Sequence, residues 1–538
     1  LRYQMPVECP PSRIVETTHG KVQGRRLVHA GDRQVDAFQG IPFAAPPIGE
    51  LRFKKPQPPA PWVGVKETKK FSARNIQVPF PGLPEDELHG EMSEDCLYLN
   101  VFTPCWDAPE GGFPVMVFIH GGAFVFGEAS SYGDIGICEN IVSRGVVFVT
   151  IQYRLGYLGF LSTGDATCPG NNALWDQTEA LKWVQANIGA FGGNKHNVTV
   201  LGQSAGSASV DLLHLSPHST NLLHKAICMA GSAESRWATR SRSTMTTQSL
   251  RKAASLGVTE YADTQELLDK LRQIPADKFA VSLFIAPTAG DRTDFETGPC
   301  IDGDFFPEDL DALRAKATPK PLLNGVTKEE GLFLMPGRRP TAEGLEETLQ
   351  HATLDCNEPE RMRKDLCSRF IGDLKPEDPE CMRAQAGIIA DAMFVAGHVK
   401  LSRKALAIQT EPIYLYVFEH YTGPSLLGAL AQVVPFQDVT HTNELFYLFK
   451  KGFFGDPEIT ETDGKVIDVF TTAFTNFAKY GNPNGSDDSA NHLSVPWKPI
   501  TKENPFQNYV FTSNESKMTN DLFEGRSAAF VEIHNRHK

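Results

Sequence analysis

A serine between two glycines is the residue whose setting in this chain most clearly predicts chemistry. Ser204 stands in the pattern Gly202-x-Ser204-x-Gly206, after an apolar and β-branched run and before a segment with helical character. Strand, sharp turn and helix around such a motif are typical of a nucleophile elbow, whose glycines let strand and helix approach closely. We therefore predict that the Ser204 hydroxyl lies at a helix N-terminus, where partial positive charge favours developing negative charge.

The motif alone is weak evidence for a nucleophile. In a chain of this length, G-x-S-x-G arises by chance with a probability of about 0.2, because glycine and serine are common residues. The alternative interpretation of Ser204 is an ordinary turn serine. A serine hydrolase also needs a base to take the hydroxyl proton and an acid to orient that base. The functional interpretation therefore depends on finding both partners elsewhere in the chain.

Composition excludes several other classes of function. The 538 residues carry a net charge of −13 and contain no basic run, so we expect no nucleic-acid partner. No apolar run reaches the 18 residues that span a bilayer, so we expect no transmembrane segment in this chain. None of the ten cysteines forms C-x-x-C, and the common metal, phosphate and dinucleotide motifs are missing. We therefore expect neither a metal nor a cofactor.

Strand-like runs alternate with helical patterns along much of the chain. Runs that are apolar throughout are typical of strands buried on both faces, whereas the proline-rich segment 42–62 should lie extended on the surface. The alternation predicts a mostly parallel sheet with helices on both faces. We expect one compact domain over residues 1–538, with helical insertions in its C-terminal half. The expected strands are 18–24, 36–42, 97–102, 114–119, 145–151, 197–203, 225–229, 321–326 and 413–418, and the expected helices are 173–190, 263–273, 342–351 and 465–480.

Four stretches carry a resemblance to a known family. Residues 40–53, 93–101, 169–177 and 191–193 resemble signatures of the type-B carboxylesterase/cholinesterase family, and they precede the elbow in the family's order. The resemblance extends from about residue 14 to about residue 535. It implies the α/β-hydrolase fold, an α/β architecture with a large, twisted, mostly parallel central sheet flanked by helices.

The resemblance also implies the partners of Ser204. Residues 325–331 are similar to the family's acid turn, which places the acid at Glu330, and residues 441–445 are similar to its histidine motif, which places the base at His441. The chain order Ser, Glu, His is the order of this fold. Taken singly, each would be an ordinary loop residue, since the chain has fifteen histidines. Their motifs favour the triad.

A further stretch resembles the family's oxyanion loop. Residues 120–123 match it, and the resemblance implies that the N–H groups of Gly122 and Ala123 donate to the oxyanion. The third donor is the N–H of Ala205, just after the nucleophile. We interpret His120 as a structural member of this loop.

Departures from the family pattern narrow the substrate. The position of the choline-binding tryptophan is Asp86, and the acid before the serine is replaced by Gln203, so choline esters are disfavoured. Trp237 and Phe295 match two aromatic positions of the acyl pocket, whereas a second phenylalanine is replaced by Thr297. We expect Trp237, Phe295, Thr297 and Gln203 to contact the substrate, and the acyl pocket to be wider than that of an acetyl-specific enzyme.

Two further departures concern the scaffold. A buried serine that the family often places behind the triad is Ala230 here. Cys96 is present, but its usual partner position is Asn75, and positions near a second bridge are Val258 and Lys270. Loss of the family's disulfides predicts a cytosol-facing protein, tethered by a tail outside this chain. The alternative is a secreted or ER-lumenal protein with new bridges among Cys356, Cys367 and Cys381.

These features together predict a serine carboxylester hydrolase that acts on a broad range of small-molecule esters. The first alternative is an acyltransferase, in which an acceptor alcohol or sugar hydroxyl takes the acyl group in place of water. The second is a non-catalytic binding module, which the presence of every triad residue disfavours. The sequence leaves the choice between monomer and homodimer open.

Overall fold

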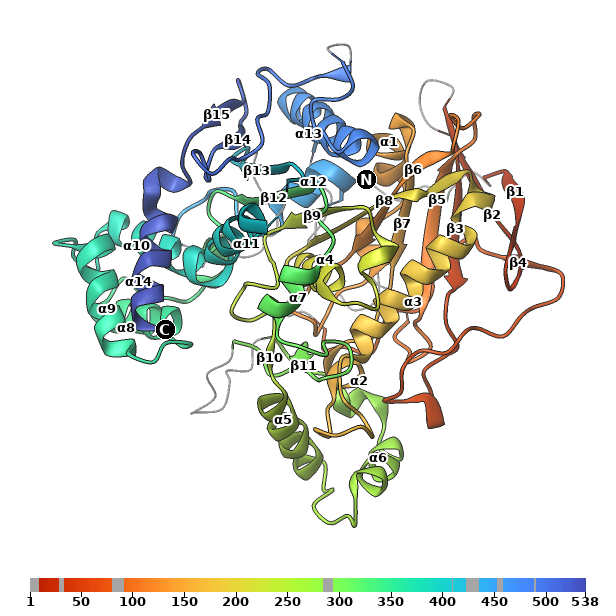
Figure 1. Ribbon diagram of the computed structural model, residues 1–538, viewed down its shortest axis with the longest axis horizontal. Helices are drawn as coiled ribbons and strands as arrows, with labels where there is room; N and C mark the ends of the chain where they lie inside the picture. The colour runs from red at the N-terminus through yellow and green to blue at the C-terminus, as the bar shows by residue number, and fades with distance from the viewer. Residues whose placement is uncertain are drawn as a thin grey trace.

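The computed structural model describes residues 9–28, 33–79, 91–283, 294–408, 410–421, 435–451, 458–487 and 490–538. A 13-stranded sheet organises them (Figure 1). Its centre is a run of parallel strands, as the alternation of strands and helices predicted. In spatial order these are β7 (Val147–Ile151), β6 (Phe113–Ile119), β8 (Gly193–Gln203), β9 (Lys225–Met229), β12 (Leu322–Thr327), β13 (Ile413–Phe418) and β14 (Asn508–Phe511).

Antiparallel strands extend the sheet at both edges. One edge continues through β5 (Tyr98–Pro104), β3 (Gln34–Pro42), β2 (Gly20–Val28) and β1 (Pro11–Thr17), and β4 (Val65–Glu67) pairs with β2. The other edge ends in β15 (Lys517–Thr519). The sequence did not predict β1, β14 or β15, because none of these segments carries an apolar run as long as that of β6.

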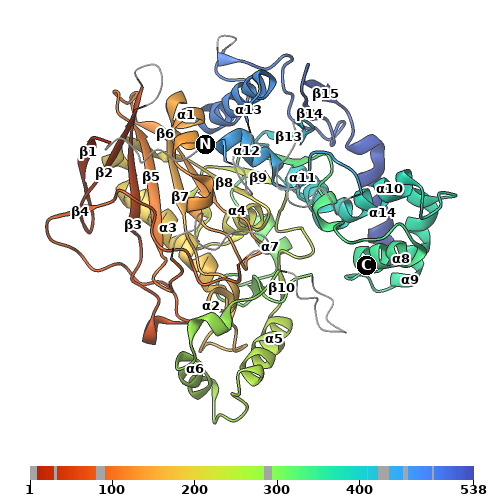
Figure 2. The same ribbon diagram turned by 180° about the vertical axis from the view of Figure 1, so that it is seen from behind.

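Strand β6 shows why the centre of the sheet is apolar throughout. Val115, Val117 and Ile119 belong to one core cluster, and Met116 and Phe118 belong to another. Successive side chains of a strand point to opposite faces, so both faces must be covered. Helices α3 (Asn172–Asn187) and α4 (Ala205–Leu215) cover the first face, and α1 (Ile135–Asn140), α12 (Asn443–Phe449) and α13 (Glu461–Tyr480) cover the second (Figure 2).

Two helices differ from their predicted bounds for local reasons. Helix α3 ends at Asn187, and a 3₁₀ turn continues to Phe191, before Gly192 adopts φ 86°. Helix α13 begins four residues before its first predicted residue, because Thr460 and Asp463 form a capping box. Its predicted inward residues are buried, namely Val466, Ile467, Phe470, Phe474 and Phe477.

The remaining helices lie around the sheet margins (Figure 1). Helices α2 (Gly156–Phe160), α5 (Arg242–Ser255), α6 (Thr264–Arg272) and α7 (Leu310–Lys316) come from the middle of the chain. The predicted helix-rich later part contains α8 (Ala342–Ala352), α9 (Pro359–Leu366), α10 (Pro379–Ala390), α11 (Ala396–Ile408) and α14 (Arg526–His537). Between α10 and α11 the chain forms a π-helical turn, Asp391–Val395. The short strands β10 (Arg240–Ser241) and β11 (Cys300–Ile301) pair with each other.

The state of the cysteines and the lengths of the helices relate to two predictions from the sequence, which concern disulfide bonds and transmembrane segments. None of the ten cysteines, all of which lie in the described segments, forms a disulfide bond. The alternative set of bridges among Cys356, Cys367 and Cys381 is therefore not formed in this structure. Among the residues that the structure describes, no helix has the length and apolar character needed to cross a membrane.

Candidate active site

Ser204 occupies a strained turn between β8 and α4. Its backbone has φ 57° and ψ −124°, and its N–H donates to the carbonyl of Met229 at 2.8 Å. A Cβ on Gly202 would lie 2.4 Å from the carbonyl carbon of Gly206, and a Cβ on Gly206 would lie 2.0 Å from the carbonyl oxygen of Ile119. Both flanking glycines are therefore required for the close packing of strand and helix, as the motif predicted.

The predicted acid and base lie in direct contact. Glu330 is fully buried after strand β12, and one of its carboxylate oxygens accepts the N–H of Thr327 at 2.6 Å. Its other oxygen lies 2.6 Å from Nδ1 of His441. The rings of Phe333 and Phe394 lie 4.8 and 4.3 Å from the imidazole, between ring centroids. The carboxylate thus holds the Nδ1 proton, and the aromatic rings restrict rotation of the imidazole.

The other ring nitrogen of His441 contacts a residue that the sequence assigned to the substrate. Nε2 of Gln203 lies 3.2 Å from Nε2 and 3.4 Å from Nδ1 of His441, and the Gln203 side chain is buried. With a proton on Nδ1 facing Glu330, Nε2 carries the lone pair and accepts a hydrogen bond from the amide. The described residues show no hydrogen bond from the Ser204 hydroxyl to His441. Contact between Gln203 and substrate stays a prediction, whereas its contact with the base is direct.

The glycine-rich loop after β6 has the shape needed to bind an oxyanion. Gly122 has φ 108°, and a Cβ there would lie 1.9 Å from the carbonyl oxygen of Phe126. A Cβ on Gly121 would lie 3.1 Å from the Cβ of Ser204, so the loop passes close to the nucleophile. In the described residues no backbone carbonyl accepts the N–H of Gly122 or Ala123. The N–H of Ala205 begins α4 and has no intrahelical partner.

His120 supports this loop as a neutral side chain. Burial lowers its pKa to about 4. Its Nδ1 donates to the carbonyl of Gly121 at 2.8 Å. Tyr153 stacks on the imidazole at 4.4 Å, and its hydroxyl donates to the carbonyl of His120 at 2.8 Å. These contacts favour the structural role over that of a base.

Aromatic rings lead from the base to the predicted acyl pocket. Phe394 contacts His441, and the ring of Trp237 lies 6.2 Å from that of Phe394. The ring of Phe295 lies 5.8 Å from Trp237 in an edge-to-face arrangement. Trp237 is also close to the nucleophile, because a Cβ on Gly231 would lie 3.1 Å from its ring and 2.4 Å from the carbonyl oxygen of Ser204.

Three other positions that the sequence analysis singled out are Thr297, Ala230 and Asp86. Thr297 is fully buried, and its hydroxyl has no hydrogen-bond partner among the described residues. No hydrogen bond between described residues therefore joins it to Ser204, Glu330 or His441. Ala230 is buried with φ 54°, and its N–H donates to the carbonyl of Gly325 at 2.8 Å. Asp86 lies outside the described residues.

The sequence analysis missed a buried acid behind the base. Glu444 is fully buried in α12, and neither of its carboxylate oxygens has a hydrogen-bond partner in the described part of the chain. Burial, and then the nearby charge of Glu330, raise the pKa of Glu444 well above its usual range. Burial of this carboxyl therefore favours its protonated form over the carboxylate. An acid three residues after His441, within an apolar helix, was the available signal.

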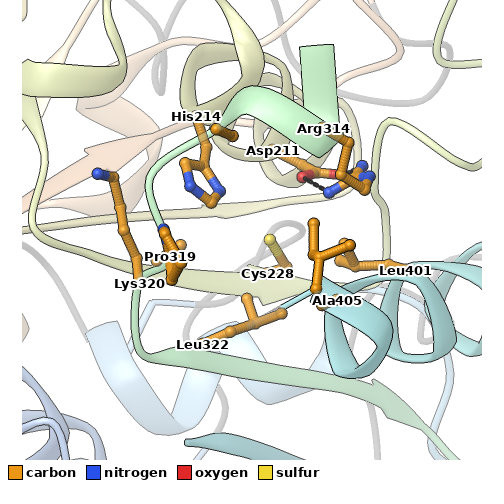
Figure 3. Close-up of a pocket in the computed structure, with 12 residues that line it drawn as sticks. Asp211, His214, Cys228, Arg314, Pro319, Lys320, Leu322, Leu401 and Ala405 are labelled. Atoms are coloured by element: carbon orange, nitrogen blue, oxygen red, sulfur yellow. Dashed lines mark hydrogen bonds and ion pairs between the residues drawn. The ribbon is translucent and has the colours of Figure 1, made fainter. Parts of the chain in front are cut away.

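A small cavity beside the C-terminal half of α4 is separate from the triad (Figure 3). Its volume is about 20 Å³, room for a single water. Asp211 and Arg314 form an ion pair at its wall, with Nη2 and Oδ2 2.9 Å apart. Burial lowers the pKa of His214, which also lines it, to about 4. Ser204 stands at the opposite end of the same helix.

A family model described as the carboxylesterase family matches residues 11–530. The chain belongs to the carboxylesterase family. Its fold is therefore the α/β-hydrolase fold that the resemblance implied, and its class of activity is ester hydrolysis. The predicted family membership and enzyme class are thus confirmed.

Similar proteins carry esterase and hydrolase names. Esterase cest-33 of Caenorhabditis elegans is 37% identical over 94% of this chain and 91% of that protein. The medium-chain fatty acyl-CoA hydrolase precursor of Anas platyrhynchos is 34% identical, over 88% of this chain and 85% of that protein. The cocaine esterase of Homo sapiens is 35% identical, over 88% and 84%.

The contact between Gln203 and the base predicts a pH effect in this carboxylesterase. A carboxylate at this position would stabilise protonated His441, the form that cannot accept the serine proton. We expect Gln203→Glu to move the acid limb of the kcat/KM profile upward by about one pH unit. The measurement is kcat/KM for p-nitrophenyl butyrate between pH 5 and 9.

A matched variant separates charge from hydrogen bonding. Gln203→Met removes the amide without adding charge, so its acid limb should stay within about 0.3 pH unit of the wild type. An unchanged acid limb in Gln203→Glu would show that the side chain does not influence the base.

Proposed function

We propose that this carboxylesterase hydrolyses carboxylic esters through a covalent acyl-enzyme. Ser204 is the nucleophile, His441 is the general base, and Glu330 orients the base and stabilises its cation. The observation that carries the proposal is the 2.6 Å contact between Glu330 and His441 Nδ1, beside a serine held in an elbow turn. Supporting it is the oxyanion loop, which passes next to Ser204.

The reaction proceeds in two halves. The Ser204 hydroxyl replaces the Gln203 amide at Nε2 of His441, passes its proton there and attacks the ester carbonyl. The N–H groups of Gly122, Ala123 and Ala205 stabilise the resulting oxyanion. The C–O bond to the alcohol breaks, and the alcohol leaves with the proton from His441. Water then gives a proton to His441 and attacks the acyl-enzyme, releasing the acid and restoring the serine.

We infer that the enzyme accepts acyl groups larger than acetyl and does not select choline esters. Trp237 and Phe295 form an aromatic wall, and Thr297 replaces a larger side chain of the family pattern. Two similar proteins are named a medium-chain fatty acyl-CoA hydrolase precursor and a cocaine esterase, and these names are compatible with such breadth. The whole chain acts as one α/β-hydrolase domain, and this chemistry requires no metal or cofactor.

A chain-length series tests the acyl pocket. For p-nitrophenyl esters from acetate to octanoate, we expect kcat/KM to rise from acetate to at least butyrate. Thr297→Phe should shift the preference toward acetate by about tenfold, because a hydrophobic pocket discriminates by roughly that factor for each methylene. Thr297→Val, which keeps the volume, should retain the wild-type profile. A strong preference of the wild type for acetate would contradict the proposed pocket.

Product analysis separates hydrolysis from acyl transfer. With p-nitrophenyl butyrate and glycerol or glucose as acceptor, hydrolysis releases butyric acid in proportion to p-nitrophenol. Formation of the acceptor ester as the main product would replace the hydrolase with the acyltransferase alternative.

A further inference from the structure

Two residues of the proposed acyl pocket each follow a member of a buried ion pair. Arg236 precedes Trp237, and Asp294 precedes Phe295. The guanidinium of Arg236 donates to both oxygens of Asp294, at 2.9 Å from Nε and 2.7 Å from Nη2. The two side chains are 7% and 4% exposed. This two-point pairing fixes the relative position of two chain segments that carry the pocket's aromatic rings.

The pair also contacts the segment that reaches the base. Nη2 of Arg236 lies 3.2 Å from the sulfur of Met393, and the Trp237 indole donates to the carbonyl of Met393 at 2.6 Å. Met393 lies in the π-helical turn, and the next residue, Phe394, contacts His441. Such turns are often found at functional sites. Arg236 and Trp237 therefore anchor the turn that presents Phe394 to the imidazole.

Outside the pocket, the pair joins helices from the later part of the chain. His351 of α8 lies 3.1 Å from Asp294, and Asp355 lies 3.8 Å from Arg236. His534 of α14 contacts Asp355 at 2.9 Å. These helices gather at one side of the sheet in both views (Figures 1 and 2). Burial raises the pKa of Asp294, but the Arg236 charge and the His351 contact outweigh it, so the pKa is lowered and the carboxyl stays ionised.

We propose that Arg236, through its pairing with Asp294, is a positioning residue that sets the acyl selectivity of this enzyme. Removing two charges from water is costly, so a buried ion pair is weak evidence for a role in stability alone. Arg236 directly precedes Trp237, and Asp294 directly precedes Phe295. Arg236 also contacts Met393, so the pair is placed to fix the positions of both aromatic rings. This inference rests on the proposed acyl-enzyme function.

The test compares selectivity in variants that weaken the pair. Arg236→Lys keeps the charge but loses the planar two-point contact, and Asp294→Asn removes one charge. We expect each to raise the ratio of kcat/KM for p-nitrophenyl octanoate to that for butyrate by about tenfold. The reason is that the rings of Trp237 and Phe295 are then held less firmly and can move to admit longer acyl chains. The ratio between butyrate esters of different alcohols should not change, since the pair directly precedes the two aromatic residues assigned to the acyl pocket.

A matched ion pair elsewhere provides the control. Arg52 donates to both oxygens of Glu94 at 2.6 Å, with side chains 10% and 15% exposed, and its ring contact among the described residues is with Phe279, which is outside the proposed pocket. Glu94→Gln should leave the acyl ratio within about twofold of the wild type. Counting active sites with a phosphonate label ensures that only folded enzyme enters each kcat/KM value.

The outcomes distinguish this inference from the proposed function. If the wild type neither turns over esters nor takes up the phosphonate, the proposed function fails. If it does both and the Arg236→Lys and Asp294→Asn ratios stay at the wild-type value, the positioning role is refuted. If neither variant folds, His351→Gln provides the test, because it weakens the contact between residue 351 and Asp294. It should shift the ratio in the same direction, and an unchanged ratio would refute the inference.

Discussion

Replacing Ser204 with alanine should lower kcat for p-nitrophenyl butyrate by a factor on the order of 10³ or more. The substitution removes the hydroxyl oxygen that we propose forms the acyl-enzyme, while the proposed oxyanion loop and acyl pocket remain to bind the ester. KM should change little, because the serine hydroxyl contributes mainly to the transition state. The measurement is steady-state kinetics, together with phosphonate labelling, which should fall from about one label per chain to none.

A second serine on the same helix serves as the control for Ser204. The Ser209 hydroxyl is buried and accepts a hydrogen bond from Gln177 at 3.1 Å, away from the base. Ser209→Ala should keep kcat within about threefold of the wild type. If the wild type is no faster than Ser204→Ala, or if Ser204 never labels, the triad is inactive and the binding-module alternative gains support.

The second large effect is expected from the acid. Glu330→Gln should reduce kcat by about 10³ to 10⁴, because the amide no longer holds the Nδ1 proton of His441 or stabilises its cation. The short contact between Glu330 and Nδ1, in a fully buried setting, makes this loss large. The Thr327 N–H, which bonds the other carboxylate oxygen, can bond the amide oxygen, so the fold should be retained. Thermal unfolding monitored beside kcat checks this.

The neighbouring acid tests whether the assignment is specific. Glu329 directly precedes Glu330, and its ion-pair partner among the described residues, Arg383, is 3.9 Å away. Burial raises the pKa of Glu329. Glu329→Gln should alter kcat by less than about threefold. A loss as large as that of Glu330→Gln would mean that the acid of the triad has been assigned to the wrong residue.

The elbow and the central strands were predictable because their causes lie in consecutive residues. Gly202 is required by a steric clash with Gly206 within one strand-turn-helix segment, whereas Gly206 is required by the close approach of α4 to the carbonyl oxygen of Ile119 at the end of β6. The apolar run of β6 reflects its burial on both faces of the sheet, and such a run can be recognised from consecutive residues. The capping box that begins α13 is also local, although the prediction started the helix four residues later. The pairing of Glu330 with His441 followed from the family resemblance, and its geometry is now visible.

Other features of the site depend on residues that only the packed chain brings together. The contact between Gln203 and His441, the aromatic link through Phe394, and the ion pair of Arg236 with Asp294 join segments far apart in sequence. The raised pKa of Glu444 likewise arises from burial and from the nearby charge of Glu330, which lies far away in sequence. The sequence by itself determined the fold class, the elbow and the members of the candidate triad, since local sterics and motifs encode them. Only the tertiary structure decided which side chains surround His441 and which contacts join the segments of the proposed acyl pocket, because hydrogen bonding and burial depend on which distant segments pack together.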